Sequence, residues 1–185
     1  MFNIRNKNIL VLGLKKSGLG AVRLLKTASG RIFVSDMALA LNIPDTEYFP
    51  YEQLTENIKF FDLIVKSPGI PYDIEILKRA KKNNIPVISE IELAYHFVKN
   101  KQIIVGVTGT NGKTTTVTLI TEILKNSNID AVKCGNIGVT FSDALLDNPT
   151  CDVFVVELSS FQLLDVYFFK PHITIFLNIS TAHLN

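Results

Sequence analysis

Short apolar runs alternate along the chain with longer segments in which apolar residues recur at helical spacing. Residues 8–12 and 31–35 are apolar, β-branched runs that predict strands, and residues 17–27 between them have the spacing of an amphipathic helix. The residues expected to face inward from this helix are Leu19, Val22 and Leu25. Strand, helix and strand in this order predict a βαβ unit with parallel strands.

The same alternation continues to the end of the chain. Further helices are predicted at residues 73–83, from Ser89 to Val98, and at residues 116–125. Further strands are predicted at residues 63–65, 86–88, 103–105, 151–156 and 173–178. Ser89 followed by Glu92 is a capping-box pattern, in which each side chain bonds the backbone amide of the other residue. The whole pattern predicts an α/β fold with parallel sheets covered by helices.

Composition and charge narrow the class of protein. The chain has 185 residues, of which 47% are hydrophobic, enough for one large or two small domains with a real core. The net charge is +2 and the basic residues are scattered, so we expect no nucleic-acid binding. No apolar stretch is long enough for a signal peptide or a membrane span, so we expect no membrane insertion. Cys134 and Cys151 lack metal-type spacing and are expected to be reduced, structural thiols.

The candidate chemistry begins with the glycine-rich segment 105–115 (VGVTGTNGKTT), which follows a predicted strand and opens a predicted helix. The first amides of a helix lack intrahelical partners and the helix dipole is positive there, so a polyphosphate finds donors and a favourable field together. Lys113 is expected to neutralise the β- and γ-phosphates, and the Thr114 hydroxyl to bind magnesium. The segment predicts ATP as the ligand, bound by Gly109, Thr110, Asn111, Gly112, Lys113, Thr114 and Thr115.

This phosphate loop departs from the general pattern G-x-x-x-x-G-K-[ST], because the first glycine is Gly109 and not the residue at Val107. Four other segments accompany it: 13–18 (GLKKSG), 66–71 (KSPGIP), 135–138 (GNIG) and 157–163 (ELSSFQL). In order and spacing the five segments resemble the Mur ligase family, which builds the peptidoglycan stem peptide in the bacterial cytoplasm. The resemblance spans essentially the whole chain, and ELSSFQL points to the member of the family that adds D-glutamate.

The resemblance implies a reaction and a division of the chain. ATP phosphorylates the carboxylate of UDP-N-acetylmuramoyl-L-alanine, and the amine of D-glutamate then attacks the acyl phosphate. The resemblance thus implies ATP and Mg²⁺ as cofactors and these two substrates as partners. It also implies that the protein is a monomer in the cytoplasm. The polar stretch 99–102 divides the chain. Residues 1–98 are expected to form a Rossmann-like UDP-sugar-binding domain, and residues 99–185 an incomplete P-loop ATPase-type α/β domain.

The first glycine loop argues against a bound dinucleotide. Gly13 and Gly18 match the ends of G-x-G-x-x-G, but Lys15 replaces the middle glycine, where a pyrophosphate needs close backbone approach. By resemblance this loop holds the uridine diphosphate of the substrate, through Ser17 and through Asp36 at the end of the second strand. An ordinary strand-end carboxylate remains the alternative for Asp36.

Further substrate contacts are implied by resemblance at Ser67, Gly69, Asn136, Ser159, Gln162 and His183. The Asn136 amide can both donate and accept hydrogen bonds. Asn and Gly together also simply form turns, so a structural role for Asn136 stays open. Ser159 has the alternative of a helix cap.

Lys113, Glu157 and His183 are the catalytic candidates, and the implied metal ligands are Thr114, Glu157 and His183. The strand 151–156 runs into Glu157 and so places a carboxylate, which magnesium prefers, near the phosphate loop. Relatives carry acidic residues around the matching histidine, whereas this chain has Ala182 and Asn185. Both changes reduce negative charge and should weaken a cation site. A solvated acid at Glu157 and an incidental histidine at position 183 are the alternatives.

By resemblance the chain ends inside the central ATPase domain. We therefore expect the lysine that the family carbamylates at its second metal, and the C-terminal domain, to lie outside these 185 residues. We also expect this polypeptide alone to lack ligase turnover. Two alternatives stay open: another Mur-type amino-acid ligase, against which ELSSFQ argues, and a non-catalytic remnant that binds a UDP-sugar or a nucleotide.

Overall fold

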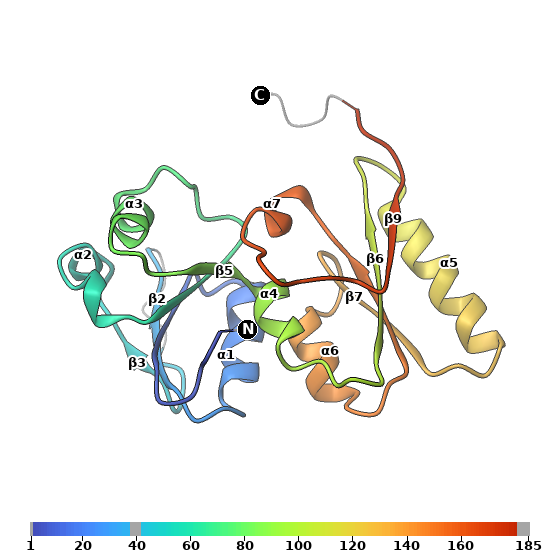
Figure 1. Ribbon diagram of the computed structural model, residues 1–185, viewed down its shortest axis with the longest axis horizontal. Helices are drawn as coiled ribbons and strands as arrows, with labels where there is room; N and C mark the ends of the chain where they lie inside the picture. Colours follow the sequence, from blue (N-terminus) through green and yellow to red (C-terminus); the bar gives the residue numbers. More distant parts are fainter. Residues whose placement is uncertain (1, 38–41, 181–185) are drawn as a thin grey trace.

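The computed structural model describes residues 2–37 and 42–180, which form two parallel β-sheets with helices between and around them (Figure 1). The first sheet has five strands in the order β3-β2-β1-β4-β5: β1 (Asn8–Leu12), β2 (Arg31–Ser35), β3 (Glu47–Tyr48), β4 (Leu63–Lys66) and β5 (Val87–Ser89). The second has four in the order β7-β8-β6-β9: β6 (Ile103–Thr108), β7 (Ala131–Gly135), β8 (Val153–Glu157) and β9 (Ile173–Phe176). The predicted α/β class with parallel sheets is confirmed.

Three helices lie between the two sheets and contact one another: α1 (Lys16–Leu25), α4 (Glu90–Tyr95) and α6 (Phe141–Asp147) (Figure 1). The outer elements of the first sheet are α2 (Tyr51–Leu54), the 3₁₀ turn η1 (Ile58–Phe60) and α3 (Glu75–Lys82). The second sheet carries α5 (Lys113–Asn126) on its outer side, and α7 (Ser160–Leu163) follows β8. This arrangement covers the first sheet on both faces, as a parallel sheet requires.

Every strand predicted from the sequence is present: β1 and β2 have the predicted bounds, and the ends of the others are shifted. The strand expected from Cys151 begins at Val153, and the helix expected from Thr116 begins three residues earlier, at Lys113. The helix from Ser89 ends at Tyr95, short of the expected Val98. The sequence pattern did not reveal β3, β7, α2, α6 and α7. These elements are short, and β7 mixes a lysine into its apolar residues, so periodicity gives little signal.

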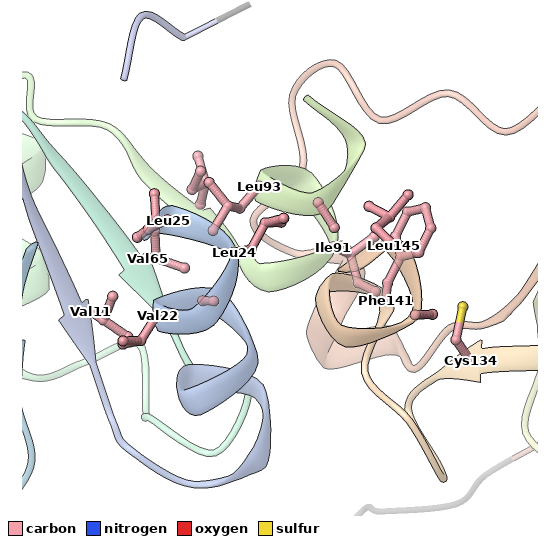
Figure 2. Close-up of a cluster of buried hydrophobic side chains, with 14 of the residues drawn as sticks. Val11, Val22, Leu24, Leu25, Val65, Ile91, Leu93, Cys134, Phe141 and Leu145 are labelled. Atoms are coloured by element: carbon pink, nitrogen blue, oxygen red, sulfur yellow. The ribbon is translucent and has the colours of Figure 1, made fainter. Parts of the chain in front are cut away.

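The largest cluster of buried apolar side chains spans both sheets. Figure 2 shows side chains of α1, α4 and α6 meeting, with Leu24, Ile91 and Phe141 among them. Phe141 is fully buried and packs edge-on against the Phe154 ring. Truncating such a core phenylalanine costs about 3–5 kcal/mol, so this cluster fixes one sheet against the other. Of the residues expected to face inward from α1, Val22 and Leu25 are buried, whereas Leu19 is only partly buried.

The capping box expected at Ser89 is only half formed. The Ser89 hydroxyl accepts a hydrogen bond from the Glu92 amide at 3.2 Å, as predicted. The Glu92 carboxylate turns away instead and accepts hydrogen bonds from the backbone amides of Tyr167, Phe168 and Phe169 at 2.9–3.1 Å. A fully buried carboxylate needs several donors, and this remote segment supplies more of them than the helix start does.

Cys134 and Cys151 are both buried and form no disulfide, in agreement with the expectation of reduced thiols. Burial raises the pKa of both thiols, which keeps them protonated and unreactive.

Candidate nucleotide-binding cleft

The predicted phosphate loop connects the end of β6 to the start of α5. Gly109 has φ +147° and Gly112, the residue before α5, has φ +84°, values that side chains rarely allow. A Cβ atom on Gly109 would lie 3.0 Å from the Leu177 Cβ and 3.1 Å from the Asn178 amide nitrogen. Both glycines therefore serve the backbone conformation that brings the first amides of α5 to the loop.

Residues that follow β9 support this loop from one side. The Asn178 side chain accepts from the Asn111 amide at 3.0 Å and donates to the Asn111 carbonyl at 3.1 Å. The Asn178 carbonyl accepts from the Thr110 amide at 3.0 Å, and the Thr110 hydroxyl accepts from the Ser180 amide at 2.9 Å. These bonds tie the phosphate loop to the segment that follows β9.

Lys113 lies over the loop that precedes it. Its ammonium donates to the carbonyls of Gly109 at 2.7 Å and Thr110 at 2.9 Å, and the side chain is half-buried. These carbonyls fix a positive charge where the helix dipole is also positive, so the loop concentrates the two features that a phosphate requires.

A carboxylate lies directly beside the start of α5. Glu157, at the end of β8, is buried, with 2% of its surface exposed. One carboxylate oxygen accepts from the Thr114 hydroxyl at 2.7 Å, and the other accepts from the Asn136 side-chain amide at 3.0 Å. The structure thus brings together three residues that the sequence predicted separately, and it excludes the alternative of a solvated acid at position 157.

The turn after β7 positions Asn136 against this carboxylate. Gly135 has φ +110°, and a Cβ atom there would lie 2.2 Å from the Glu157 carbonyl oxygen. The Asn136 amide donates to that same carbonyl at 2.9 Å. Asn136 therefore contacts Glu157 through both its backbone and its side chain, which orients the carboxylate.

The phosphate loop opens into a cleft of about 960 Å³ that residues of both sheets line. On one side lie Gly109, Thr110 and Lys113. On the other lies the segment that follows β4 and contains Gly69. The remaining lining includes Asn136, Ser159, Phe161, Phe176 and Asn178. A volume of this size suits a nucleotide-sized ligand.

Comparison with known proteins identifies the family. Residues 107–185 match the model of the Mur ligase middle domain. The chain is 43% identical, over 99% of its length, to the UDP-N-acetylmuramoylalanine--D-glutamate ligase of Caldicellulosiruptor bescii, and 44% identical, over 98%, to that of Bacillus cereus strain G9842. The chain belongs to the Mur ligase family. It spans 42% of the length of these curated relatives.

Solved structures agree with this assignment at the level of the fold. The UDP-N-acetylmuramate:L-alanyl-gamma-D-glutamyl-meso-diaminopimelate ligase of Neisseria meningitides superposes with a TM-score of 0.58, covering 97% of this chain and 62% of that one at 17% identity. The UDP-N-acetylmuramate-alanine ligase of Thermotoga maritima gives 0.51, covering 96% and 43% at 19% identity. The arrangement of two α/β sheets is thus a Mur ligase arrangement.

Of the substrate residues that the family resemblance implied in the first half of the chain, Asp36 and Ser67 directly follow strands and Ser17 lies in α1. The Asp36 carboxylate, after β2, accepts from the Leu14 amide at 2.7 Å. The buried Ser67 hydroxyl, after β4, donates to the Gly13 carbonyl at 2.8 Å, and Ser17 is half-buried in α1. Among the residues that the structure describes, the lining of the large cleft includes Gly69 but not Ser17, Asp36 or Ser67. Asp36 and Ser67 instead bond the loop that follows β1, at Leu14 and Gly13.

Ser159 and Gln162 bond to each other. The Ser159 hydroxyl accepts from the Gln162 amide at 3.3 Å, and the Gln162 side-chain oxygen accepts from the Ser159 amide at 3.0 Å. This reciprocal pair is a capping box at the start of α7, so part of the family's ELSSFQL motif has a structural cause. Ser159 still lines the cleft, whereas Gln162 is buried.

His183 and its neighbours Ala182 and Asn185 lie outside the described residues, so the role of His183 stays a prediction. Within residues 2–37 and 42–180, no three His, Cys, Asp or Glu side chains lie together as a metal cluster. The donors available for magnesium there are the Thr114 hydroxyl and the Glu157 carboxylate. Both are hard oxygen ligands, and they fit that ion.

Sequence reasoning did not identify two parts of the site. Asn178 was assigned only to the end of a strand, although an amide side chain directly after a strand beside a phosphate loop is a usable signal. The contacts of Lys66, Tyr72 and Asp165 were not foreseen either. They join residues far apart in the chain and have no local pattern.

Proposed function

We propose that this chain belongs to an ATP-dependent ligase that joins D-glutamate to UDP-N-acetylmuramoyl-L-alanine, and that it supplies the binding of ATP and of the UDP-sugar. The observation that carries the proposal is the shared cleft, in which Lys113 of the phosphate loop and Gly69 of the first sheet line one cavity. A ligase of this kind must bring a phosphoryl donor and a carboxylate acceptor together. The names of the curated relatives support the choice of substrates.

The topology supports the binding of different ligands by the parts of the chain before and after residue 98. In each parallel sheet, a ligand is expected at the carboxyl ends of the strands where the strand order reverses. In the first sheet this point lies between β1 and β4, whose loops carry Gly13 and Ser67. In the second it lies at β6, which the phosphate loop follows. We therefore assign the binding of the UDP-sugar to residues 1–98 and the binding of ATP to residues 99–185.

The residues of the chain act by positioning and by charge. The amides at the start of α5 and the Lys113 ammonium would hold the β- and γ-phosphates of ATP, and Glu157, oriented by Asn136, would face the Thr114 hydroxyl. Magnesium, held by Thr114 and Glu157, would neutralise charge on the transferred phosphoryl group. The γ-phosphoryl passes to the alanyl carboxylate and ADP leaves. The D-glutamate nitrogen then bonds to the acyl carbon, with loss of phosphate and a proton.

We place this reaction in the cytoplasm and expect a monomer, as the family resemblance implies. In the part of the chain that the structure describes, no helix combines the length and the apolar character needed to cross a membrane.

Isothermal titration calorimetry of the chain with UDP-N-acetylmuramoyl-L-alanine, UDP-N-acetylmuramate and Mg·ATP tests the proposal. We expect micromolar binding, about −8 kcal/mol, of Mg·ATP and of the alanyl compound. A preference for UDP-N-acetylmuramate would favour the ligase that adds L-alanine. Binding of UDP-sugars without ATP would favour a nucleotide-binding remnant. Binding of none of the three would contradict the proposal.

A further inference from the structure

Lys66, the last residue of β4, is a fully buried cation at the edge of the cleft. No part of its side chain is exposed, and it directly precedes the segment Ser67–Tyr72, whose residues 68–72 line the cleft. A buried ammonium is costly unless it is paired and hydrogen-bonded, so its partners show what it holds in place.

The partners of Lys66 come from two separate parts of the chain. Its ammonium lies 3.2 Å from a carboxylate oxygen of Asp165 and donates to the Ile70 carbonyl at 3.2 Å. It also lies 4.1 Å from the centre of the Tyr72 ring, and the Tyr72 hydroxyl donates to the same Asp165 oxygen at 2.5 Å. Ile70 and Tyr72 belong to the cleft segment, whereas Asp165 follows α7 of the second sheet. Lys66 thus links the cleft segment that follows β4 to the segment that follows α7.

Asp165 is itself fixed. Its side chain is 9% exposed, and its carbonyl accepts from the Ser89 amide at 2.9 Å. The next residues, 167–169, donate their amides to the buried Glu92 carboxylate of α4. The segment after α7 is therefore fastened to the first sheet at several points, and it offers Lys66 a rigid anion.

We propose that Lys66 is a positioning residue: through Asp165, Tyr72 and the Ile70 carbonyl, it fixes the cleft segment Ser67–Tyr72 at the distance from the phosphate loop that a shared ligand cleft requires. The identity of the ligand in this inference, a UDP-sugar, rests on the proposed function. Apolar residues of similar volume often stabilise a fold as well as a buried ion pair does. Lys66 differs from such apolar residues because its ammonium also donates a hydrogen bond to the Ile70 carbonyl.

The test uses the whole chain and four variants: Lys66→Met, Asp165→Leu, the double variant, and Lys7→Met as a control. Lys7 forms an exposed pair with Asp62 at 2.9 Å, so the control removes a lysine–aspartate pair at the surface. The readouts are the thermal midpoint, calorimetric affinities for UDP-N-acetylmuramoyl-L-alanine and Mg·ATP, and hydrogen exchange of the Ile70 amide. That amide bonds the Ser67 carbonyl at 3.1 Å within the segment.

Each single variant leaves a buried partner unpaired and is expected to lower the thermal midpoint. The double variant is expected to recover the midpoint, because two apolar groups meet. Its Ile70 amide should still exchange at least about tenfold faster, and its UDP-sugar affinity should stay about tenfold weaker, with ATP binding unchanged. Lys7→Met should behave as the unmodified chain in every readout.

Recovery of midpoint, Ile70 exchange and UDP-sugar affinity together in the double variant would overturn the proposal, because Lys66 would then be only structural. If the unmodified chain binds no UDP-sugar, the proposed function fails. In that case, the exchange of the Ile70 amide still decides whether Lys66 fixes the segment.

Discussion

The Thr114 hydroxyl donates a hydrogen bond of 2.7 Å to the Glu157 carboxylate, joining the start of α5 to the end of β8. The two residues are far apart in the sequence and come from different motifs, the phosphate loop and the ELSSFQL segment. Their contact places a buried carboxylate next to the helix start where phosphates are expected. A cation that binds between them would meet one hydroxyl and one carboxylate oxygen, the ligands that magnesium takes.

Glu157→Gln is expected to remove the magnesium dependence of ATP binding. The glutamine keeps the volume, its side-chain oxygen can accept from the Asn136 amide, and its nitrogen can donate to the Thr114 hydroxyl, so the fold should lose no more than about 1 kcal/mol. It removes the negative charge that would hold the cation. Calorimetric titration of ATP with and without magnesium checks this. Equal gains from magnesium in the variant and the unmodified chain would show that Glu157 does not hold the ion.

Gly135→Ala is expected to destabilise the chain by about 3 kcal/mol or more, because φ is +110° there and the added Cβ would lie 2.2 Å from the Glu157 carbonyl oxygen. Gly138→Ala is the matched control. Gly138 has φ +76°, but no atom lies within 4 Å of its Cβ position, so only the strained backbone, about 1 kcal/mol, is felt. Urea unfolding measures both. Equal losses would mean that the turn moves away from Glu157.

Glu90 is expected to make the chain less stable as the pH rises. The residue is buried at the start of α4, where burial raises the pKa of its carboxyl to about 7, against a hydrogen bond from the Ser142 amide that lowers it. The nearby Asp143 carboxylate raises it further. Its other oxygen has no hydrogen-bond partner among the described residues. The Glu90 carboxyl therefore holds its proton more tightly in the folded state than in the unfolded state, where its pKa is 4.5.

The stabilising contribution of the Glu90 proton is complete below about pH 4.5 and is lost as the pH rises to about 7 and above, amounting to about 3 kcal/mol. Glu90→Gln mimics the neutral form. We expect the free energies of unfolding of the two proteins, measured in urea, to be similar at about pH 5 and the variant to be the more stable at about pH 8. A difference that does not change between these pH values would contradict the prediction. Comparing the two proteins cancels the acid titration of carboxylates that do not interact with Glu90, such as Asp62, whose pKa is lowered by hydrogen bonds from Lys7 and from the Asn8 amide.

Local patterns predicted the elements that carry them and little else. The apolar runs that became β1, β2 and β4 were found because each is a buried strand of a parallel sheet, where nearly every residue is apolar. The phosphate loop was found because its glycines, lysine and threonine are adjacent in the chain. Edge strand β7 and the short helix α7 were not found. A lysine interrupts the apolar residues of β7, and α7 has only four residues, so neither element has a long apolar pattern.

Long-range pairing could not be predicted from the sequence. The Glu92 carboxylate fits a helix cap equally well in the sequence, and only the fold brings the amides of residues 167–169 to it. The Thr114–Glu157 contact needed β6 and β8 to be neighbours, which follows from the sheet order and not from any motif. The candidate residues were therefore foreseeable singly, and their geometry was not.

The most direct measurement is the affinity of this chain for Mg·ATP, compared between the unmodified protein, Lys113→Ala and Lys125→Ala. Both lysines lie on α5, but Lys113 contacts the phosphate loop and Lys125 lies in the last turn. We expect micromolar binding that Lys125→Ala leaves unchanged and Lys113→Ala weakens roughly hundredfold, since a charged contact to phosphate is lost. Equal affinities for all three proteins, or no binding by the unmodified chain, would contradict the assignment of this loop to ATP.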